Sequence, residues 1–466
     1  MIMRANYTFT LLLISILIIT SCSKTSVNSL SVLAASPIDT AEVRFLKNHP
    51  FRAMKYGLFV HYVKDLTVYS NGNPCSGLNE LTGNFNATSF ANDAEAMGVE
   101  YVIFTAWHAG MFLLYPSPKM DSWIPGHTSK NDLIGPMIDA LQAKGIKVLL
   151  YTHPYLGYQF TDTEKTLTGW GAGVNAQGDA APNWATFNFT KWNNFVNDVY
   201  GELIDSYGSR IDGLFMDEGD PKAQMNKAVD FSRLRSTIKS RNPNLILVQN
   251  DHGNLYTADI GAIEEYGWQE FSQPDGNLWP CYDMPVASII SKDWWASLPA
   301  GINGLRYSVE NLFRYTVLQA GANTDGGGVC WAAGPYADGG WENGVKEQLI
   351  LLGNYISPIS KSIKNTYAST SWVTSSKSTI NMIYWGVATQ STDGKYEYIH
   401  VLKPPAGKKL SLSIPADGKK FSTANLLINN HIVTLLQDST GLTLTLTGDD
   451  NWDSLDTVIQ LTVVRN

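Results

Sequence analysis

The sequence predicts an α/β fold, a (β/α)8-type TIM barrel followed by a C-terminal antiparallel β-sandwich. Across residues 51–352, short apolar segments alternate with amphipathic segments, a pattern typical of parallel strands joined by crossover helices. After residue 365 the pattern changes to a period of two, with turn residues between the runs. Polar residues recur directly after the apolar segments, where barrel strands carry their functional loops.

The N-terminus has the pattern of a bacterial export signal. Arg4 precedes an apolar run over residues 11–19, and Thr20 and Ser21 lead into Cys22. The run is shorter than the roughly 20 residues that span a bilayer. We therefore expect a lipoprotein signal peptide over residues 1–21 and a lipid on Cys22, which places the protein on the periplasmic or surface face of an outer membrane. An ordinary cleaved signal peptide with an unrelated Cys is the alternative.

The predicted chain then continues as a flexible tether over residues 22–39, a catalytic barrel over 40–365 and the sandwich over 366–466. The barrel strands that can be counted are residues 56–61, 101–105, 147–151, 213–216, 245–249 and 328–331. Helices are predicted over residues 132–144 and 192–207, and the missing strands are expected within 268–306. Sandwich strands are predicted at residues 396–401, 410–414, 442–446 and 458–463.

The composition argues against nucleic-acid binding and favours binding of sugars. The net charge of -8 and the lack of a Lys/Arg run argue against a nucleic-acid partner. The 14 Trp residues suit the apolar faces of sugar rings. With Cys22 acylated, Cys75, Cys281 and Cys330 remain without metal-ligand spacing. We expect no metal, no cofactor and at most one disulfide.

The polar residues after the strands are expected to meet at one mouth, because the carboxyl ends of parallel barrel strands all lie there. The acidic pair Asp217 and Glu218 follows the most informative strand, residues 213–216. Successive side chains of a strand point in opposite directions, so only one of this pair can face the mouth. The other strand-end residues are His61, Trp107, His108, Thr152, His153, Asn250, Asp251 and His252.

In their order along the chain, these segments resemble the α-L-fucosidases of glycoside hydrolase family 29, over roughly residues 40–466. The motifs are KYGLFVH at 55–61, EYVIFTAWH at 100–108, DGLFMD at 212–217 and DIGAIE at 259–264. The resemblance implies a retaining exo-glycosidase that removes terminal α-L-fucose, or a closely related sugar, through a covalent glycosyl-enzyme.

The resemblance also implies the roles of individual residues. Asp217 is the expected nucleophile and Glu264 the expected acid/base, with Glu265 as its main competitor and Glu80 and Glu270 as weaker candidates. The residues expected to shape the sugar site are His61, Trp107, His108, His153, Phe215, His252 and Trp268. The expected partner is an oligosaccharide or glycoconjugate, with membrane contact through the lipid anchor only.

Several positions depart from the family pattern. Ala109 replaces a second His, Trp107 stands where a Lys is common, Phe215 replaces a Trp, and His252 replaces an Arg. Two alternatives follow, a retaining hydrolase of another sugar such as an α-L-galactoside, and a glycan-binding lipoprotein without catalysis. The retained carboxylates argue against the second alternative, because charges that serve no chemistry are costly to desolvate.

Overall fold

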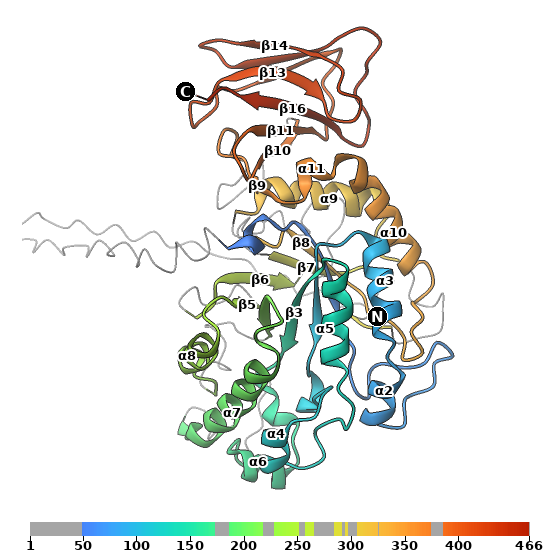
Figure 1. The fold of residues 1–466 in the computed structure, drawn as a ribbon, viewed down its shortest axis with the longest axis vertical. Coiled ribbons are helices and arrows are strands. Elements are labelled where there is room, and N and C mark those ends of the chain that lie inside the picture. Colours follow the sequence, from blue (N-terminus) through green and yellow to red (C-terminus); the bar gives the residue numbers. More distant parts are fainter. Residues whose placement is uncertain are drawn as a thin grey trace, which may run out of the picture.

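The computed structural model contains a barrel and a sandwich stacked along the long axis of the molecule (Figure 1). It describes residues 49–172, 186–217, 228–250, 257–264, 284–290, 294–296, 305–324, 326–373 and 385–465.

The first domain is a closed barrel of parallel strands in the order β1 to β8, with β8 paired to β1. This confirms the predicted fold class. The strands are β1 (Tyr56–Val60), β2 (Tyr101–Thr105), β3 (Lys147–Thr152), β4 (Gly213–Met216), β5 (Ile246–Gln249), β6 (Ile260–Glu264), β7 (Met284–Ser288) and β8 (Val329–Ala332). Of the two strands expected within residues 268–306, β7 lies there and β6 lies just before that range.

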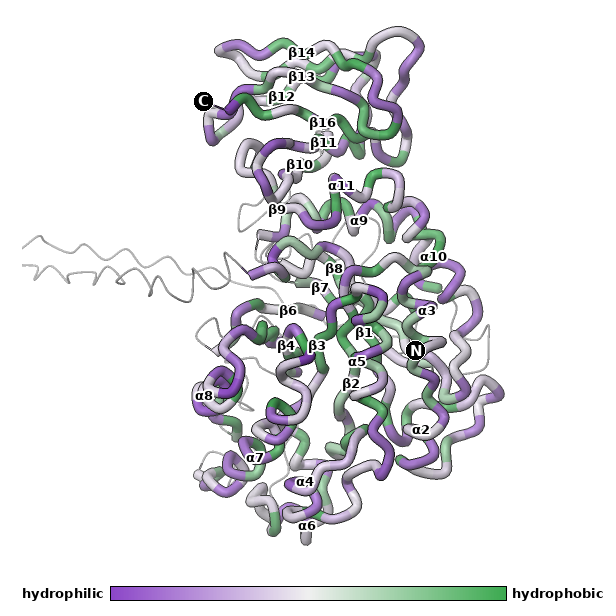
Figure 2. Tube along the Cα trace, in the orientation of Figure 1, coloured by the Kyte–Doolittle hydropathy of each residue, from purple (hydrophilic) through white to green (hydrophobic). Residues whose placement is uncertain are grey.

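Helices cover the outside of the barrel, and two of them, α5 and α7, match the predicted helices. Figure 2 shows hydrophilic and hydrophobic residues mixed along the outer helices, as expected for helices with one buried face. The helices are η1 (Pro50–Ala53), α2 (Leu78–Asn84), α3 (Ala87–Met97), η2 (Ala109–Met111), α4 (Pro118–Trp123), α5 (Ile134–Ala143), η3 (Leu156–Gln159), α6 (Asp162–Thr168), α7 (Thr190–Tyr207), α8 (Phe231–Arg241), α9 (Val309–Ala322), α10 (Val345–Ile356), η6 (Ser357–Ile359) and α11 (Ser360–Ile363). Within the described ranges, none of them is both long and apolar enough to cross a membrane.

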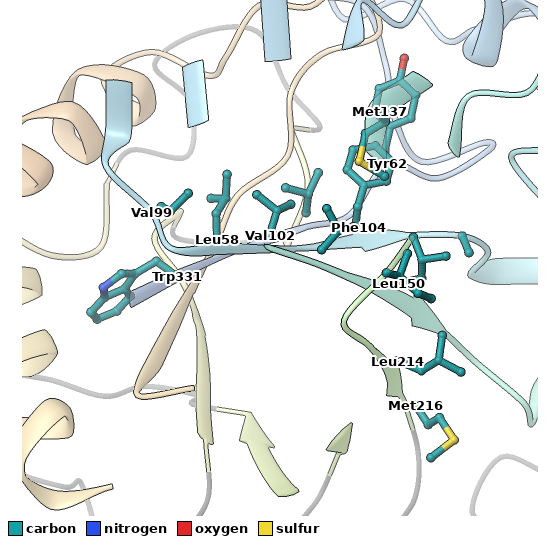
Figure 3. Close-up of a cluster of buried hydrophobic side chains, with 14 of the residues drawn as sticks. Leu58, Tyr62, Val99, Val102, Phe104, Met137, Leu150, Leu214, Met216 and Trp331 are labelled. Atoms are coloured by element: carbon teal, nitrogen blue, oxygen red, sulfur yellow. The ribbon is translucent and has the colours of Figure 1, made fainter. Parts of the chain in front are cut away.

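The barrel strands have two buried faces, so their residues feed two separate apolar layers. Leu58, Val102 and Leu214 belong to the layer between strands and helices (Figure 3). Phe59 and Phe215 belong to the layer inside the barrel. Because neighbours along a strand alternate, the residue two positions after an inner residue also points inward. This rule selects the side chains that reach the mouth.

The second domain consists of two antiparallel sheets, as the period-two pattern predicted. The five-stranded sheet has the order β13-β16-β11-β10-β9, and the three-stranded sheet has the order β12-β15-β14. Apolar residues of both sheets form a third buried cluster. The strands are β9 (Thr366–Ala368), β10 (Gly386–Ser391), β11 (Tyr396–Val401), β12 (Lys409–Leu412), β13 (Phe421–Leu426), β14 (Val433–Gln437), β15 (Leu442–Leu446) and β16 (Thr457–Val463).

The sandwich is joined to the barrel at the end where the strands begin. Glu100, just before β2, accepts hydrogen bonds from the backbone N–H groups of Lys55 at 2.8 Å and of Asn365 at 3.2 Å. Thus one carboxylate connects the start of β1 to the residue that precedes β9. In Figure 1, α4 and α6, which follow β2 and β3, lie at the far end from the sandwich. The mouth of the barrel therefore faces away from the sandwich.

The domains pack closely at Gly321, where α9 meets β10. A Cβ atom at Gly321 would lie 2.6 Å from Cβ of Val387 and 3.1 Å from the carbonyl oxygen of Ala388. The first distance is shorter than real side chains allow, and both neighbours belong to or adjoin a paired strand. Only glycine therefore fits at this position without moving the helix from the sheet.

Gly321→Ala is expected to lower the melting temperature in a thermal unfolding measurement. The added methyl group overpacks the interface, at a cost of about 1–3 kcal/mol. Gly83→Ala in α2 is the matched control, because its nearest neighbour is the side-chain nitrogen of Asn131 at 3.3 Å. The control is expected to keep or raise the melting temperature, since Ala favours a helix over Gly by about 0.5–1 kcal/mol. A Gly321→Ala protein as stable as the wild type would contradict the tight interface.

Candidate active site

Asp217 occupies the centre of the mouth. It follows β4, two residues after the inward-facing Phe215, so alternation turns its side chain inward too. The residue is 9% exposed, and each oxygen of its carboxylate accepts a hydrogen bond: Oδ2 from Tyr151 Oη, and Oδ1 from Asn250 Nδ2 at 2.6 Å. Asp217 of the acidic pair Asp217 and Glu218 therefore faces the mouth, and Glu218 lies outside the described residues.

Glu264 ends β6 and comes close to Asp217 through a shared partner. The same Nδ2 of Asn250 that binds Asp217 also lies 2.6 Å from Oε1 of Glu264. Asn250 follows β5, the strand between β4 and β6, and is 1% exposed. The barrel order therefore places a buried amide between the two carboxylates that the sequence singled out.

Three histidines surround Asp217 on the side of β1, β2 and β3. The ring centroid of His108 lies 4.9 Å from that of His61 and 5.8 Å from that of His153. Tyr151 is stacked on His108 with a centroid distance of 5.4 Å, and it lies 4.7 Å from His61. The structure therefore brings together the three histidines that the sequence placed at separate strand ends.

Burial holds these histidines in the neutral form. It lowers the pKa of His61 well below its usual value, lowers that of His108, and lowers that of His153 to about 3. The negative charge of Asp217 opposes this effect without reversing it. Nδ1 of His108 accepts the N–H of Ala109 at 2.6 Å, so the neutral ring carries its hydrogen on Nε2. Neutral imidazoles of this kind can bind uncharged hydroxyl groups.

The same surroundings keep Asp217 ionised. Burial alone would raise the pKa of its carboxyl group, but the positive charge that His153 can carry, together with the hydrogen bonds from Tyr151 and Asn250, lowers it below the usual value. Because His153 is neutral near pH 7, its charge does not act there, whereas the two hydrogen bonds continue to stabilise the carboxylate.

Trp107 and Phe215, both expected to contact the sugar, lie behind the site instead. Trp107 is fully buried in the layer between strands and helices, where its Nε1 donates to the backbone carbonyl of His153 at 3.1 Å. Phe215 is 1% exposed and stacks on Tyr151 inside the barrel, with a centroid distance of 5.7 Å. Their positions support His153 and Tyr151 rather than direct contact with a ligand.

The site also contains residues that the sequence did not single out. Tyr151 could have been found by counting back two positions from His153, because both then face inward. Trp294 and Trp295 lie with their ring centroids 6.4 and 5.9 Å from that of His61. They belong to a segment without a strand or helix pattern, so only their aromatic character was visible beforehand.

The remaining candidate site residues lie away from the mouth or outside the described residues. Glu80 is on α2, where Tyr69 and Ser76 bond to its carboxylate. His252, Glu265, Trp268 and Glu270 lie outside the described residues, as do Cys22 and Cys281. Cys75 and Cys330 are not bonded to each other. Among the described side chains, no group of three His, Cys, Asp or Glu residues is arranged to hold a metal ion.

Comparison with solved structures shows a shared fold. The chain matches α-L-fucosidase isoenzyme 1 from Paenibacillus thiaminolyticus at 18% identity and a TM-score of 0.62, covering 91% of this chain and all of the other. It matches a family 29 α-L-fucosidase from Bacteroides thetaiotaomicron, a trapped covalent intermediate in complex with 2-fluoro-fucosyl fluoride, at 16% identity and 0.62, covering 89% and 95%. It matches the Thermotoga maritima α-fucosidase at 18% identity and 0.57, covering 90% and 98%.

Comparison with curated protein sequences gave no match. The profile of the family described as Alpha-L-fucosidase, in contrast, matches residues 79–358, which is more than half of the chain. This range runs from α2 to η6 and includes Asp217, Asn250 and Glu264. The chain therefore belongs to the α-L-fucosidase family of glycoside hydrolases.

Proposed function

We propose that this glycoside hydrolase is a retaining exo-α-L-fucosidase that releases terminal α-L-fucose, or a closely related sugar, from glycans. The observation that carries the proposal is the pair of carboxylates, Asp217 and Glu264, held on one nitrogen of Asn250. Glycoside hydrolysis requires two such groups on either side of the scissile bond.

The short separation of the two carboxylates supports retention of configuration. Oδ1 of Asp217 and Oε1 of Glu264 each lie 2.6 Å from Nδ2 of Asn250, so the distance between the two oxygens cannot exceed the sum of these two distances. This fits the spacing of about 5–5.5 Å in retaining enzymes, whereas inverting enzymes need about 6.5–9.5 Å to admit a water molecule. The trapped covalent intermediate of the Bacteroides thetaiotaomicron enzyme agrees with such a mechanism in a protein of the same fold.

In the proposed reaction, an oxygen of Asp217 attacks the anomeric carbon while Glu264 gives its proton to the departing glycosidic oxygen. The bond to the leaving group breaks, and an ester between the sugar and Asp217 forms. Glu264, now ionised, takes a proton from water, whose oxygen attacks the same carbon and releases the sugar. The lowered pKa of Asp217 suits the first step, because a nucleophile must be ionised.

Three neutral histidines and the nearby tryptophans suit an uncharged sugar as the substrate. His61, His108 and His153 offer N–H groups to hydroxyls, and Trp294 and Trp295 add apolar surface beside His61. A panel of nitrophenyl glycosides tests the proposal. Release of nitrophenol from the α-L-fucoside supports the proposal. Release only from another glycoside, such as the α-L-galactoside, would show that the substrate is a different sugar, and no release from any glycoside contradicts the proposal.

Asp217→Gly is expected to lower kcat by at least about a thousandfold, as loss of other catalytic nucleophiles does. Azide should restore turnover of an activated fucoside and yield a glycosyl azide of inverted configuration, because the small anion fills the space of the carboxylate. Asp212→Asn is the matched control, since Asp212 lies just before β4, at the opposite end of the same strand, and bonds to the N–H of Val148. A variant at Asp217 with more than a tenth of wild-type activity would refute its role.

Glu264→Ala is expected to slow hydrolysis of a natural glycan far more than that of a dinitrophenyl fucoside. A proton donor matters most when the leaving group is poor, and proton transfer contributes about 10²–10⁴-fold. The comparison is kcat/KM on both substrates, with Glu265→Ala measured beside it. If Glu265→Ala shows the selective loss and Glu264→Ala does not, the adjacent residue is the acid/base.

We also propose, from the sequence alone, that the protein is exported and held at a membrane by a lipid on Cys22. The apolar run over residues 11–19 and the small residues before Cys22 support this. Two or three acyl chains anchor stably, whereas one alone binds only marginally.

Cys22→Ser is expected to move the protein from the membrane fraction to the soluble fraction, or to leave the signal segment uncleaved. Fractionation followed by mass determination of the N-terminus measures both outcomes. A membrane-bound mutant with a normally processed N-terminus would show that the anchor lies elsewhere.

A further inference from the structure

Asn250 is placed so that one amide group serves both carboxylates. Its Nδ2 has two hydrogens, and the two acceptors at 2.6 Å are Oδ1 of Asp217 and Oε1 of Glu264. The orientation of the amide follows from chemistry, because an amide oxygen in this place could donate to neither carboxylate. Both hydrogens of one nitrogen are thereby assigned to the catalytic pair.

The backbone holds Asn250 in this position. Its N–H donates to the carbonyl oxygen of Met216 at 2.9 Å, directly before Asp217 in the chain. The N–H of Asp217 in turn donates to the carbonyl oxygen of Thr152 at 2.9 Å. These bonds extend the parallel pairing of β3, β4 and β5 by one residue into the mouth, so they fix the backbone from which the side chain of Asn250 leaves.

We propose that Asn250 is a positioning residue that fixes the separation of the two catalytic carboxyls and confines the transferable proton to Oε2 of Glu264. The inference rests on the proposed function, since it assigns a task within that reaction. Oε1 of Glu264 already accepts an N–H, so a proton on this oxygen would meet the amide hydrogen. The acid form of Glu264 therefore presents its O–H on the other oxygen.

The bridge also acts on the charges of both groups. A hydrogen bond donated to an ionised carboxylate stabilises that form and lowers its pKa. For Asp217 this contribution is one of the hydrogen bonds that offset burial. Replacing Asn250 by an apolar residue of similar shape removes one donor from each carboxylate, so the pKa of each group should rise. A residue with a packing role alone would leave both unchanged.

The test is the pH dependence of kcat/KM on nitrophenyl α-L-fucoside for the full-length wild type, Asn250→Leu and Gln249→Met. Gln249 is the preceding residue, fully buried, with its side chain bonded to Thr257 at 3.0 Å, so the control also replaces a buried amide. In Asn250→Leu, both limbs of the bell-shaped profile should move to higher pH by about one unit, with at least a tenfold loss at the optimum. Gln249→Met should keep both limbs in place, whatever its stability.

Asn250→Asp keeps the shape of the side chain, so it provides the same test if Asn250→Leu does not fold. The added carboxylate removes the N–H donor and places a negative charge beside both carboxyl groups, which raises their pKa values. Both limbs of the pH profile should therefore again move to higher pH. Limbs that stay in place in a folded variant at position 250 overturn the proposal. The same holds if Gln249→Met moves them as far as Asn250→Leu does.

A second measurement separates this proposal from the proposed function. If the wild type hydrolyses no glycoside, the function fails, but the bridge can still be judged from melting temperatures at pH 7 and at a series of pH values below about 4, the usual pKa of an Asp side chain. A lowered carboxyl pKa stabilises the fold above the unfolded-state pKa, and this contribution disappears as pH falls through the folded-state pKa. The difference between wild type and Asn250→Leu should therefore narrow as the pH falls below about 4, because the folded-state pKa of Asp217 lies below the usual value for an Asp side chain. A difference independent of pH overturns the bridge.

Discussion

The alternation of side chains along the closed parallel barrel is the constraint on which the rest of the structure depends. The described apolar residues of the strands are buried on both faces of the barrel wall, so the register of a strand cannot shift by one residue without exchanging the two apolar layers. That rigidity decides which residues reach the mouth. Phe59 and Phe215 fill the interior, and His61 and Asp217, two positions later, emerge above them. The catalytic geometry is thus a consequence of the same packing that stabilises the domain.

The site combines one stabilised negative charge with neutral neighbours. A buried carboxylate is costly unless it is paired or hydrogen-bonded, and among the described residues Tyr151 and Asn250 stabilise Asp217 as neutral donors. In the proposed mechanism, a buried ion pair would screen the carboxylate more strongly than neutral donors do and would weaken its attack on carbon. Burial lowers the pKa of His61 and of His153, so these rings add no positive charge near pH 7.

The sequence predicted the fold class, most barrel strands and the strand-end positions of Asp217 and the three histidines, because these follow from periodicity and strand ends. Glu264 was expected only from the family resemblance, since β6 was not among the predicted strands. It did not predict the task of Asn250. A strand-end Asn has many uses, and only the order β4, β5, β6 reveals that it lies between two acids. Trp107 was misplaced because β2 ends at Thr105. Alternation from the inner residues Tyr101 and Ile103 would turn Trp107 inward, but beyond the strand this alternation stops, and Trp107 lies in the outer layer. The positions of Trp294 and Trp295 in the site could not be predicted, because their segment has no strand or helix periodicity.

The attachment of the sandwich at the strand-start end of the barrel has a consequence for the size of substrate that the protein can handle. Glu100 ties the junction there, and Gly321 brings α9 against β10, so the described part of the sandwich adds no wall to the mouth. A glycan still attached to a bulky protein or to a long polymer can approach without steric hindrance from the described part of the second domain. Discrimination by the size of the aglycone then falls to the loops that follow the barrel strands, which can vary without disturbing the joint between the domains.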